Sequence, residues 1–348
     1  MKRKIIFTIV IIILAVAGFL AWKVFGPTVK APESKYFYIK TGSTYADVKR
    51  SLLEKNIISS SFFFDKLASQ AKYTNAVKAG RYEIKDGMSL YSLVRMLRSG
   101  NQSPVKLVIN KLRTKEQLAG KLAANFETDS LSIINFLYNA DSLSNYGLDT
   151  NTVMTAVIPN TYNITWNSSA SKIFRKLYNE QEIFWNSERK QKASGLNMTP
   201  QQVYIMASIV EEETNVDADK GKIASVYINR IETGMKLEAD PTTKFAMRAF
   251  ALTRILKVHT EFPSPYNTYR QTGLPPGPIC TPSTKTIDAV LNAPQTNYIF
   301  FVAQPDPEFK GLSNFAATYA EHLVYAAAYH KFLDSLAIAR AQRAAKAK

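Results

Sequence analysis

The hydrophobic pattern begins with an uninterrupted apolar run near the amino terminus. Residues 5–22 contain no charged side chain and lie between Lys2-Arg3-Lys4 and Lys23. In a helix that rises about 1.5 Å per residue, this run spans roughly 27 Å, close to the hydrocarbon thickness of a bilayer at about 30 Å. A buried helix of a soluble domain fits poorly, because the run has no polar face. The pattern therefore predicts a transmembrane helix.

The charges beside this run predict its orientation. Basic residues at one end of a span stay in the cytoplasm, so Lys2-Arg3-Lys4 places everything after Lys23 outside the cytoplasmic membrane. A cleaved signal peptide is the alternative, because Ala15-Val16-Ala17 resembles a cleavage site. The apolar run continues past this tripeptide to Trp22, which favours an uncleaved single-pass anchor. Both interpretations export the rest of the chain.

A second pattern occurs three times between residues 36 and 125. Each copy has a short β-prone run, a turn with a Ser or Thr that can cap a helix, and apolar residues at helical spacing. The first two copies place Gly42 and Gly87 in the turn, where a tight turn favours glycine. These strand–turn–helix units loosely resemble LysM carbohydrate-binding modules, and generic α+β packing units are the alternative. The β-prone runs are Tyr36–Ile39, Arg81–Ile84 and Lys106–Ile109.

The remaining pattern is mostly helical with loop-rich stretches, so the predicted fold class is α+β. The expected order is a basic stub and anchor, a stalk containing Pro27 and Pro32, LysM-like units, a mixed catalytic domain and a basic, solvated helical tail. The corresponding ranges are 1–25, 26–35, 36–125, 126–335 and 336–348.

One helix of the large domain has a strong start signal. Thr199-Pro200-Gln201-Gln202 combines a capping Thr, Pro at the first position and Gln three residues after the cap. The helix then continues to Thr214, and Val203, Met206, Ala207 and Val210 share one stripe.

Three consecutive glutamates follow at the end of this helix, and the stripe separates them by environment. Glu213 lies on its flank, Glu212 points away and is expected to be solvated, and Glu211 lies on the other edge. Desolvation raises the pKa of a carboxyl group, so Glu213 could hold a proton near neutral pH and act as the general acid of a glycosidase. An acidic run at a solvated helix end is the alternative, and the helix pattern alone leaves both open.

Composition narrows the function classes. Lys and Arg number 44 against 28 Asp and Glu, and the net charge of +16 favours an anionic neighbour. Export makes nucleic acid a poor partner and leaves phospholipid or teichoic surfaces and the acidic cell-wall polymer. The single cysteine, Cys280, excludes an internal disulfide or thiolate cluster, and three histidines make a His-rich zinc site unfavourable. The acid–base groups of an enzyme would therefore be carboxylates.

Several loops after this helix combine Pro and Gly with Tyr and Asn. Rigid loops of this kind suit sugar recognition, because aromatic rings stack on pyranose faces and amides bond acetamido groups. A structural cluster of turns is the alternative. The loops are Asp240-Pro241-Thr242, Pro265 to Tyr269, and Gly273 to Pro278.

Six motifs in the same order resemble the MltG (YceG-like) endolytic murein transglycosylases, over about residues 36–333. They are Ala207 to Thr214, Ala224 to Arg230, Asp240-Pro241-Thr242, Tyr266-Asn267-Thr268-Tyr269, Gly273 to Gly277, and Tyr298 to Ala303. The resemblance implies that Glu213, directly before the motif Thr, is the catalytic glutamate. It gives Glu211 a structural or substrate-orienting role. The candidates for glycan contact or cleft support are Tyr266, Asn267, Tyr269, Asn229 and Asp240.

The same resemblance implies a chemistry and a setting. Glu213 would cleave the bond between N-acetylmuramic acid and N-acetylglucosamine within nascent strands without water, leaving 1,6-anhydro ends, and no metal or organic cofactor is needed. The partners implied are peptidoglycan strands, inner-membrane lipid and, as a guess, the membrane-bound synthases. Two other hypotheses are a non-catalytic, LysM-like wall-binding scaffold and a basic exported protein that associates with anionic lipid.

Overall fold

The computed structural model describes residues 2–305 and 311–346, and the chain divides into two compact units. The two units alternate along the sequence, so the single boundary expected near residue 125 does not separate them. The first unit comprises Met1–Leu107, Leu122–Asp129 and Tyr162–Ile173, and the second comprises Val108–Lys121, Ser130–Thr161 and Phe174–Lys348.

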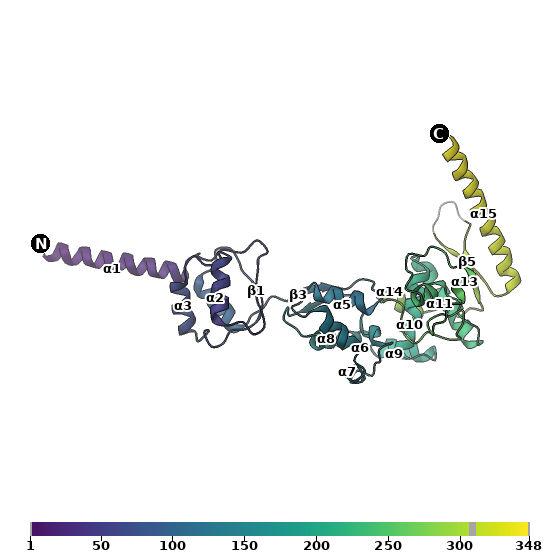
Figure 1. Cartoon of the computed structure of the whole chain (residues 1–348), viewed down its shortest axis with the longest axis horizontal. Helices are drawn as coiled ribbons and strands as arrows, with labels where there is room; N and C mark the ends of the chain where they lie inside the picture. Colours follow the sequence, from purple (N-terminus) through teal and green to yellow (C-terminus); the bar gives the residue numbers. More distant parts are fainter. Residues whose placement is uncertain (1, 306–310, 347–348) are drawn as a thin grey trace. The chain divides into compact units, whose positions relative to one another are not determined.

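The predicted amino-terminal helix is present as α1 (Lys2–Phe25), drawn in purple in Figure 1. None of its residues is buried, although its sequence is strongly apolar. Within the described part of the chain, α1 is the helix whose length and composition suffice to cross a membrane. An exposed apolar helix of this kind is unfavourable in water, and a lipid environment removes that cost.

The first two predicted strand–turn–helix units are confirmed in the first unit. Strand β1 (Tyr36–Ile39) leads to α2 (Tyr45–Glu54) and α3 (Ser61–Gln70), and β2 (Gly80–Glu83) leads to α4 (Leu90–Ser99). The strands pair antiparallel, with Tyr36 opposite Glu83. Thr44 and Ser89 cap α2 and α4, as the sequence predicts. The core between these elements includes Phe37, Ile39, Leu52, Phe64 and Leu93.

The stalk expected at residues 26–35 is packed against this unit. Val29 is 1% exposed and belongs to the same hydrophobic core. Its amide donates a hydrogen bond to the Met88 carbonyl, and its carbonyl accepts one from the Gly87 amide. The Pro-containing composition predicted a stalk here and did not reveal that Val29 packs into the core of the first unit.

The third predicted unit has a different partner. Strand β3 (Val105–Val108) pairs with β4 (Thr161–Ile164) and is followed by α5 (Lys115–Ala123). The third unit therefore joins a separate two-stranded sheet. The resemblance of these units to LysM modules stays a prediction.

The second unit is largely helical, and its core surrounds α10 (Pro200–Glu213). Figure 1 shows α10 beside α11 (Asp217–Glu232) and α14 (Thr284–Leu291), and both helices contact it. Strands β5 (Phe300–Ala303) and β6 (Ser313–Ala316) form an antiparallel pair. The other elements are α6 (Ser130–Tyr138), α7 (Ala140–Ser144), the 3-10 helix η1 (Val153–Ala156), α8 (Ala170–Phe184), α9 (Ser187–Gly195), α12 (Asp240–Ala246), α13 (Lys257–Thr260) and α15 (Tyr319–Lys346).

The predicted start of α10 is confirmed in detail, since Thr199 and Gln202 form a capping box before Pro200. The predicted one-sided stripe was too narrow, because every residue from Val203 to Val210 is buried. A helix that is apolar on all sides lies inside a core. The predicted helical tail is present to Lys346, within α15, and residues 347–348 lie outside the described residues.

Candidate active site

Glu213 is the last residue of α10, and a buried tyrosine of the neighbouring helix holds it. The hydroxyl of Tyr227, on α11, donates a 2.7 Å hydrogen bond to Glu213 Oε1. Tyr227 itself is 2% exposed, and its ring contacts Phe301 edge-on at 6.0 Å between centroids. Buried tyrosine hydroxyls usually need a polar partner, and here Glu213 is that partner. The carboxyl group is therefore fixed at the helix end while Glu213 stays partly accessible.

The environment of Glu213 raises its pKa to about 7. Desolvation makes the largest contribution to this shift, and the negative charge of Asp240 adds to it. The Tyr227 hydrogen bond and the positive charges of Lys244 and Arg230 act in the opposite direction. Because burial outweighs these groups, the carboxyl group can carry a proton near neutral pH. A carboxyl group with this pKa can donate a proton in one step and accept one in the next.

The negative charge of a second carboxylate, that of Asp240, acts on Glu213. Asp240, at the start of α12, accepts a 2.6 Å hydrogen bond from the Tyr269 hydroxyl. Burial and this hydrogen bond raise the pKa of Tyr269, and the charge of Glu213 contributes. The structure thus brings together three of the predicted site residues, Glu213, Asp240 and Tyr269. Tyr227 is added to them.

Glu212 has a different environment from the one predicted. Its carboxylate accepts from Arg113 at 2.8 and 3.1 Å and lies 3.3 Å from the Lys111 ammonium, and its side chain is 14% exposed. The prediction of a solvated Glu212 was wrong, because α10 is surrounded by other segments at this end as well. A paired carboxylate of this kind neutralises two cations and links α10 to residues 111–113.

Glu211 is held by α14 and by α11. Ser283 donates to Glu211 Oε2 at 3.1 Å, Thr286 also donates to it, and the Lys220 ammonium lies 3.7 Å away. These partners occupy the carboxylate and tie the end of α10 to its two neighbouring helices. The geometry supports the structural role proposed for Glu211 and leaves little of it for substrate.

Two of the residues predicted for glycan contact or cleft support, Asn229 and Asn267, form hydrogen bonds with the protein backbone. The Asn229 amide donates to the carbonyls of Thr296 and Tyr298 at 2.9 and 2.8 Å, which holds the segment before β5. Asn267 is fully buried, donates to the carbonyls of Thr260 and Phe262, and accepts from Thr243 and from the Tyr269 amide. Direct sugar contact by Asn267 is therefore excluded by its burial, and its function is to shape the loop that carries Tyr266 and Tyr269.

Tyr266 lines a cavity of about 200 Å³ together with Arg113, Arg248 and Tyr138. Its ring contacts Phe245 at 4.9 Å. A smaller cavity of about 130 Å³ also contains Arg113 and Phe245 and adds Glu212 and Lys244. Glu213 lines neither cavity, but Lys244, which lines the smaller one, contributes its positive charge to the environment of the Glu213 carboxyl group. The two cavities give polar, aromatic surface on the side of α12.

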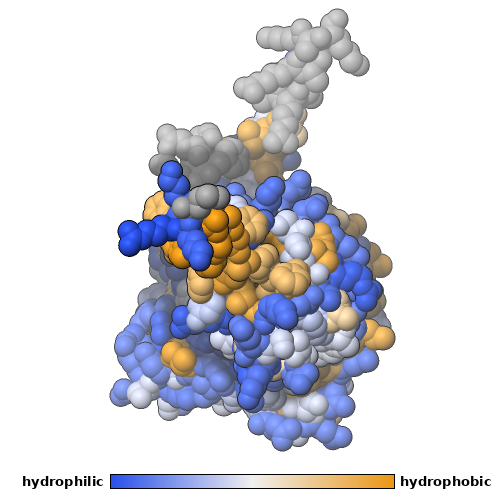
Figure 2. Space-filling view, turned by 90° about the vertical axis from the view of Figure 1, so that its left-hand side faces the viewer, coloured by the Kyte–Doolittle hydropathy of each residue, from blue (hydrophilic) through white to orange (hydrophobic). Residues whose placement is uncertain are grey.

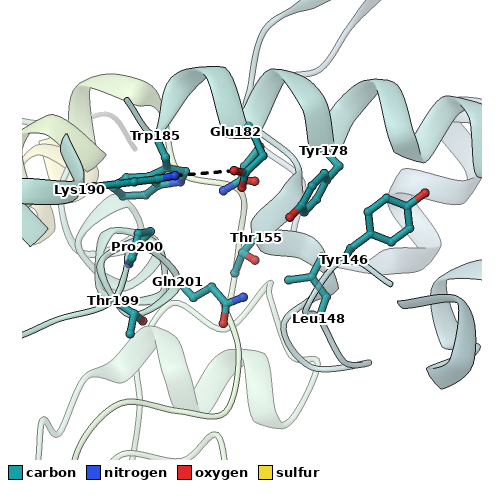
Figure 3. Close-up of a pocket in the computed structure, with 11 residues that line it drawn as sticks. Tyr146, Leu148, Thr155, Tyr178, Glu182, Trp185, Lys190, Thr199, Pro200 and Gln201 are labelled. Carbon is teal, nitrogen blue, oxygen red and sulfur yellow. Dashed lines mark ion pairs between the residues drawn. The ribbon is translucent and has the colours of Figure 1, made fainter. Parts of the chain in front are cut away.

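A separate cavity of about 370 Å³ lies at the opposite end of α10 (Figure 3). Tyr178 of α8 and Gln201 of α10 point into it, and Glu182 forms an ion pair with Lys190 at 3.7 Å beside it. The 14 residues of α10 separate this cavity from Glu213 by about 20 Å along the helix. It therefore does not belong to the Glu213 site.

Comparison with known proteins places this geometry in a family. The sequence model of the YceG-like family matches residues 37–328, which cover most of both units and every site residue described above. The chain belongs to the YceG-like family. The fold expected from the motifs, a mixed α+β protein with a YceG-like domain, is thereby confirmed.

Individual YceG-like relatives agree with this assignment. The chain is 27% identical over 299 residues to the endolytic murein transglycosylase of Bacillus subtilis (strain 168), covering 82% of this chain and 81% of that protein. It is 26% identical over 304 residues to the enzyme of the same name from Streptococcus pneumoniae (strain ATCC BAA-255 / R6), covering 76% of this chain and 53% of the relative. The 2.6 Å crystal structure of a YceG-like protein from Listeria monocytogenes superposes with a TM-score of 0.54 at 25% identity, covering 83% of this chain and 98% of that one.

Sequence reasoning missed three members of this YceG-like site. Tyr227 and Arg230 lie inside one of the quoted motifs, and Lys244 lies just after another. The available signal for Tyr227 was a tyrosine within an apolar helix, whose hydroxyl must find a partner when buried. Among the described residues no cluster of His, Cys, Asp and Glu is placed to hold a metal, and the absence of a cofactor stays a prediction.

Proposed function

We propose that this chain is an endolytic murein transglycosylase that uses Glu213 as its acid and base. The observation that carries the proposal is the partly buried Glu213 carboxyl group with a pKa of about 7, hydrogen-bonded to Tyr227. Two YceG-like relatives carry the name endolytic murein transglycosylase, which supports the same activity. The substrate is the glycan strand of peptidoglycan.

The reaction divides into two proton transfers at one carboxyl group. Protonated Glu213 donates to the glycosidic oxygen as the bond from this oxygen to C1 of N-acetylmuramic acid breaks. The C6 hydroxyl of the same sugar then attacks C1 and gives its proton to the Glu213 carboxylate. The C6 hydroxyl takes the place of water as the nucleophile, so a 1,6-anhydro ring forms and the acid is regenerated without hydrolysis. Tyr227 positions the carboxyl group for both transfers.

We further propose that α1 anchors the enzyme in the cytoplasmic membrane with its amino terminus inside. Support comes from the exposed apolar surface of α1 and from the basic Lys2, Arg3 and Lys4 before it. The two compact units then face the cell wall, where nascent strands are available. Partnership with the membrane-bound synthases rests on this shared location alone, and the LysM-like units are proposed to contact glycan.

The products of murein digestion test this function. Full-length protein in detergent is incubated with purified sacculi, and the released fragments are analysed by mass spectrometry. We expect fragments that end in 1,6-anhydro-N-acetylmuramic acid, one water lighter than hydrolysed ends. Hydrated reducing ends would instead indicate a hydrolase that uses Asp240 as its second carboxylate. Absence of product from folded protein would favour a wall-binding scaffold.

The groups around Glu213 predict opposite shifts of the pH profile in two variants. Activity requires protonated Glu213, so it falls as pH rises through a pKa of about 7. Tyr227→Phe removes a hydrogen bond that favours the Glu213 carboxylate, so the pKa of Glu213 rises and the alkaline limb of the pH profile moves to higher pH. Asp240→Asn removes a negative charge near Glu213, so the pKa of Glu213 falls and the alkaline limb moves to lower pH. Each shift should be roughly one pH unit.

The measurement is the rate of anhydro-end formation between pH 5 and 9. Tyr329→Phe and Asp334→Asn, both on α15, are matched controls that should leave the limb in place. Shifts of the same sign in both site variants would contradict the assignment of this limb to Glu213. If Asp240→Asn removes activity at every pH, Asp240 takes part in the chemistry directly.

A further inference from the structure

A groove of about 460 Å³ lies between α3 and α4 in the first unit. Its apolar surface comes from Leu67, Ala71 and Val94, together with the ring of Tyr91. Its polar lining is dominated by the cations Lys78, Arg95 and Arg98, and among the described residues that line it none is an Asp or Glu. The groove therefore combines an apolar floor with a purely positive charge.

Backbone carbonyls accept hydrogen bonds from two of these three cations. Lys78 donates to the Ser99 carbonyl at 3.1 Å, and Arg98 Nε donates to the Ala71 carbonyl at 3.0 Å. Arg95 is exposed on α4. Within the described part of the chain, no ion pair joins any of the three to an acidic side chain. Backbone carbonyls orient two of the cations and leave donors available for an anion.

The groove lies at the outer end of the anchor helix. The ring of Tyr91 contacts Phe25, the last residue of α1, at 5.5 Å between centroids. The hydrogen bonds between Val29 and the segment 87–88 fix the chain just after α1 to the start of α4. Figure 2 looks along α1 and shows apolar surface on this side of the molecule, with hydrophilic residues around it. If α1 spans the bilayer, Tyr91 lies at the level of the headgroups.

We propose that this groove binds an anionic phospholipid of the leaflet in which α1 ends. Arg95, Arg98 and Lys78 would bind the phosphate, because guanidinium groups bond two phosphate oxygens at once. The part of an acyl chain next to the headgroup would lie against Leu67, Ala71 and Val94. The proposal rests on the membrane anchoring proposed above and is independent of catalysis by Glu213.

The chemistry of the groove favours a lipid over a soluble anion. A free phosphate would use the three cations and leave the apolar floor in contact with water. The acidic cell-wall polymer could pair with the cations but has no acyl chain to cover the apolar floor. An anionic phospholipid satisfies both surfaces and is concentrated where Tyr91 lies. A bound lipid would hold the first unit against the membrane surface, at a fixed distance from the glycan strand.

Lipid retention by the full-length protein tests the groove. The protein is purified in detergent with equal amounts of phosphatidylglycerol and phosphatidylcholine, and the lipids that stay bound are counted by native mass spectrometry. We expect the wild type to retain phosphatidylglycerol selectively. Each basic residue near an anionic surface contributes roughly fivefold in affinity, so the triple variant Lys78→Gln, Arg95→Gln, Arg98→Gln should lose about a hundredfold.

A matched variant controls for charge alone. Lys40→Gln, Lys106→Gln, Arg175→Gln removes three exposed cations outside the groove and should keep the selectivity. Glycerol phosphate at the same concentration should not displace the lipid, and displacement would reduce the site to a phosphate site. Equal retention by the wild type and the groove variant, or equal loss in the control, overturns the proposal.

Two further measurements separate this proposal from the others. Alkaline extraction of membranes tests anchoring, and both triple variants should stay in the pellet with the wild type. Murein digestion in detergent tests catalysis, and the groove variant should still form anhydro ends, which Glu213→Gln should not. Release of all three proteins by alkali would contradict the anchor and with it the lipid site. Loss of lipid selectivity by a variant that still forms anhydro ends would support the groove.

Discussion

Replacement of Glu213 by Gln is expected to reduce the formation of anhydro ends by about 10²- to 10⁴-fold. Glutamine has nearly the same shape and its oxygen can still accept the hydrogen bond from Tyr227, so the packing at the end of α10 should be preserved. It cannot, however, give a proton to the leaving oxygen or take one from the C6 hydroxyl. The rate of product formation from sacculi, followed by mass spectrometry, measures the loss.

Control variants locate this effect at one carboxylate. Glu232→Gln removes an exposed glutamate from α11 and should leave the rate unchanged. Glu212→Gln should mainly lower stability, because it leaves Arg113 and Lys111 without their partner. Wild-type rates in folded Glu213→Gln would rule out Glu213 as the acid. If folded Glu213→Gln and folded Glu212→Gln lose the same amount of activity, the loss cannot be assigned to Glu213 alone.

The local elements were predictable because their signals are local. The apolar run to Trp22, the caps Thr44 and Ser89, and the capping box at Thr199 each involve residues within a few positions of one another. Helix and strand positions in the first unit follow from these signals. The family was predictable because its motifs occur in a fixed order, and comparison with known proteins confirmed it.

The environment of each carboxylate depended on contacts that sequence spacing does not show. Glu212 meets Arg113, about a hundred positions earlier, and Glu211 meets Thr286, more than seventy positions later. A helical stripe assumes one buried face, and α10 is buried on all sides, so the direction of a side chain did not indicate its exposure. The prediction that Asn267 contacts sugar was wrong because its burial also depends on contacts that the sequence does not show. A loop composition suited to sugar binding cannot show that an amide is already used by the backbone.

The raised pKa of Glu213 also has a consequence for stability, because the folded and unfolded states bind its proton differently. The ordinary pKa of 4.5 applies to the unfolded chain, and the folded value is about 7. Below pH 4.5 both states are protonated and no penalty exists. Between these values the unfolded state loses its proton first, so stability falls as pH rises. Above pH 7 the full penalty of about 3 kcal/mol is present.

Glu213→Gln should therefore be more stable than the wild type at pH 8, by about 3 kcal/mol beyond any difference at pH 4. The second unit is followed through Trp185, which is 2% exposed and packs in the same core as α10. Trp22→Phe and Trp166→Phe are introduced into both proteins so that Trp185 alone reports denaturant unfolding in detergent. Glu232→Gln should show no pH-dependent gain. Parallel stability curves for Glu213→Gln and its parent would mean that the carboxyl group titrates normally, and Glu213 would then lack the protonation that a general acid requires near neutral pH.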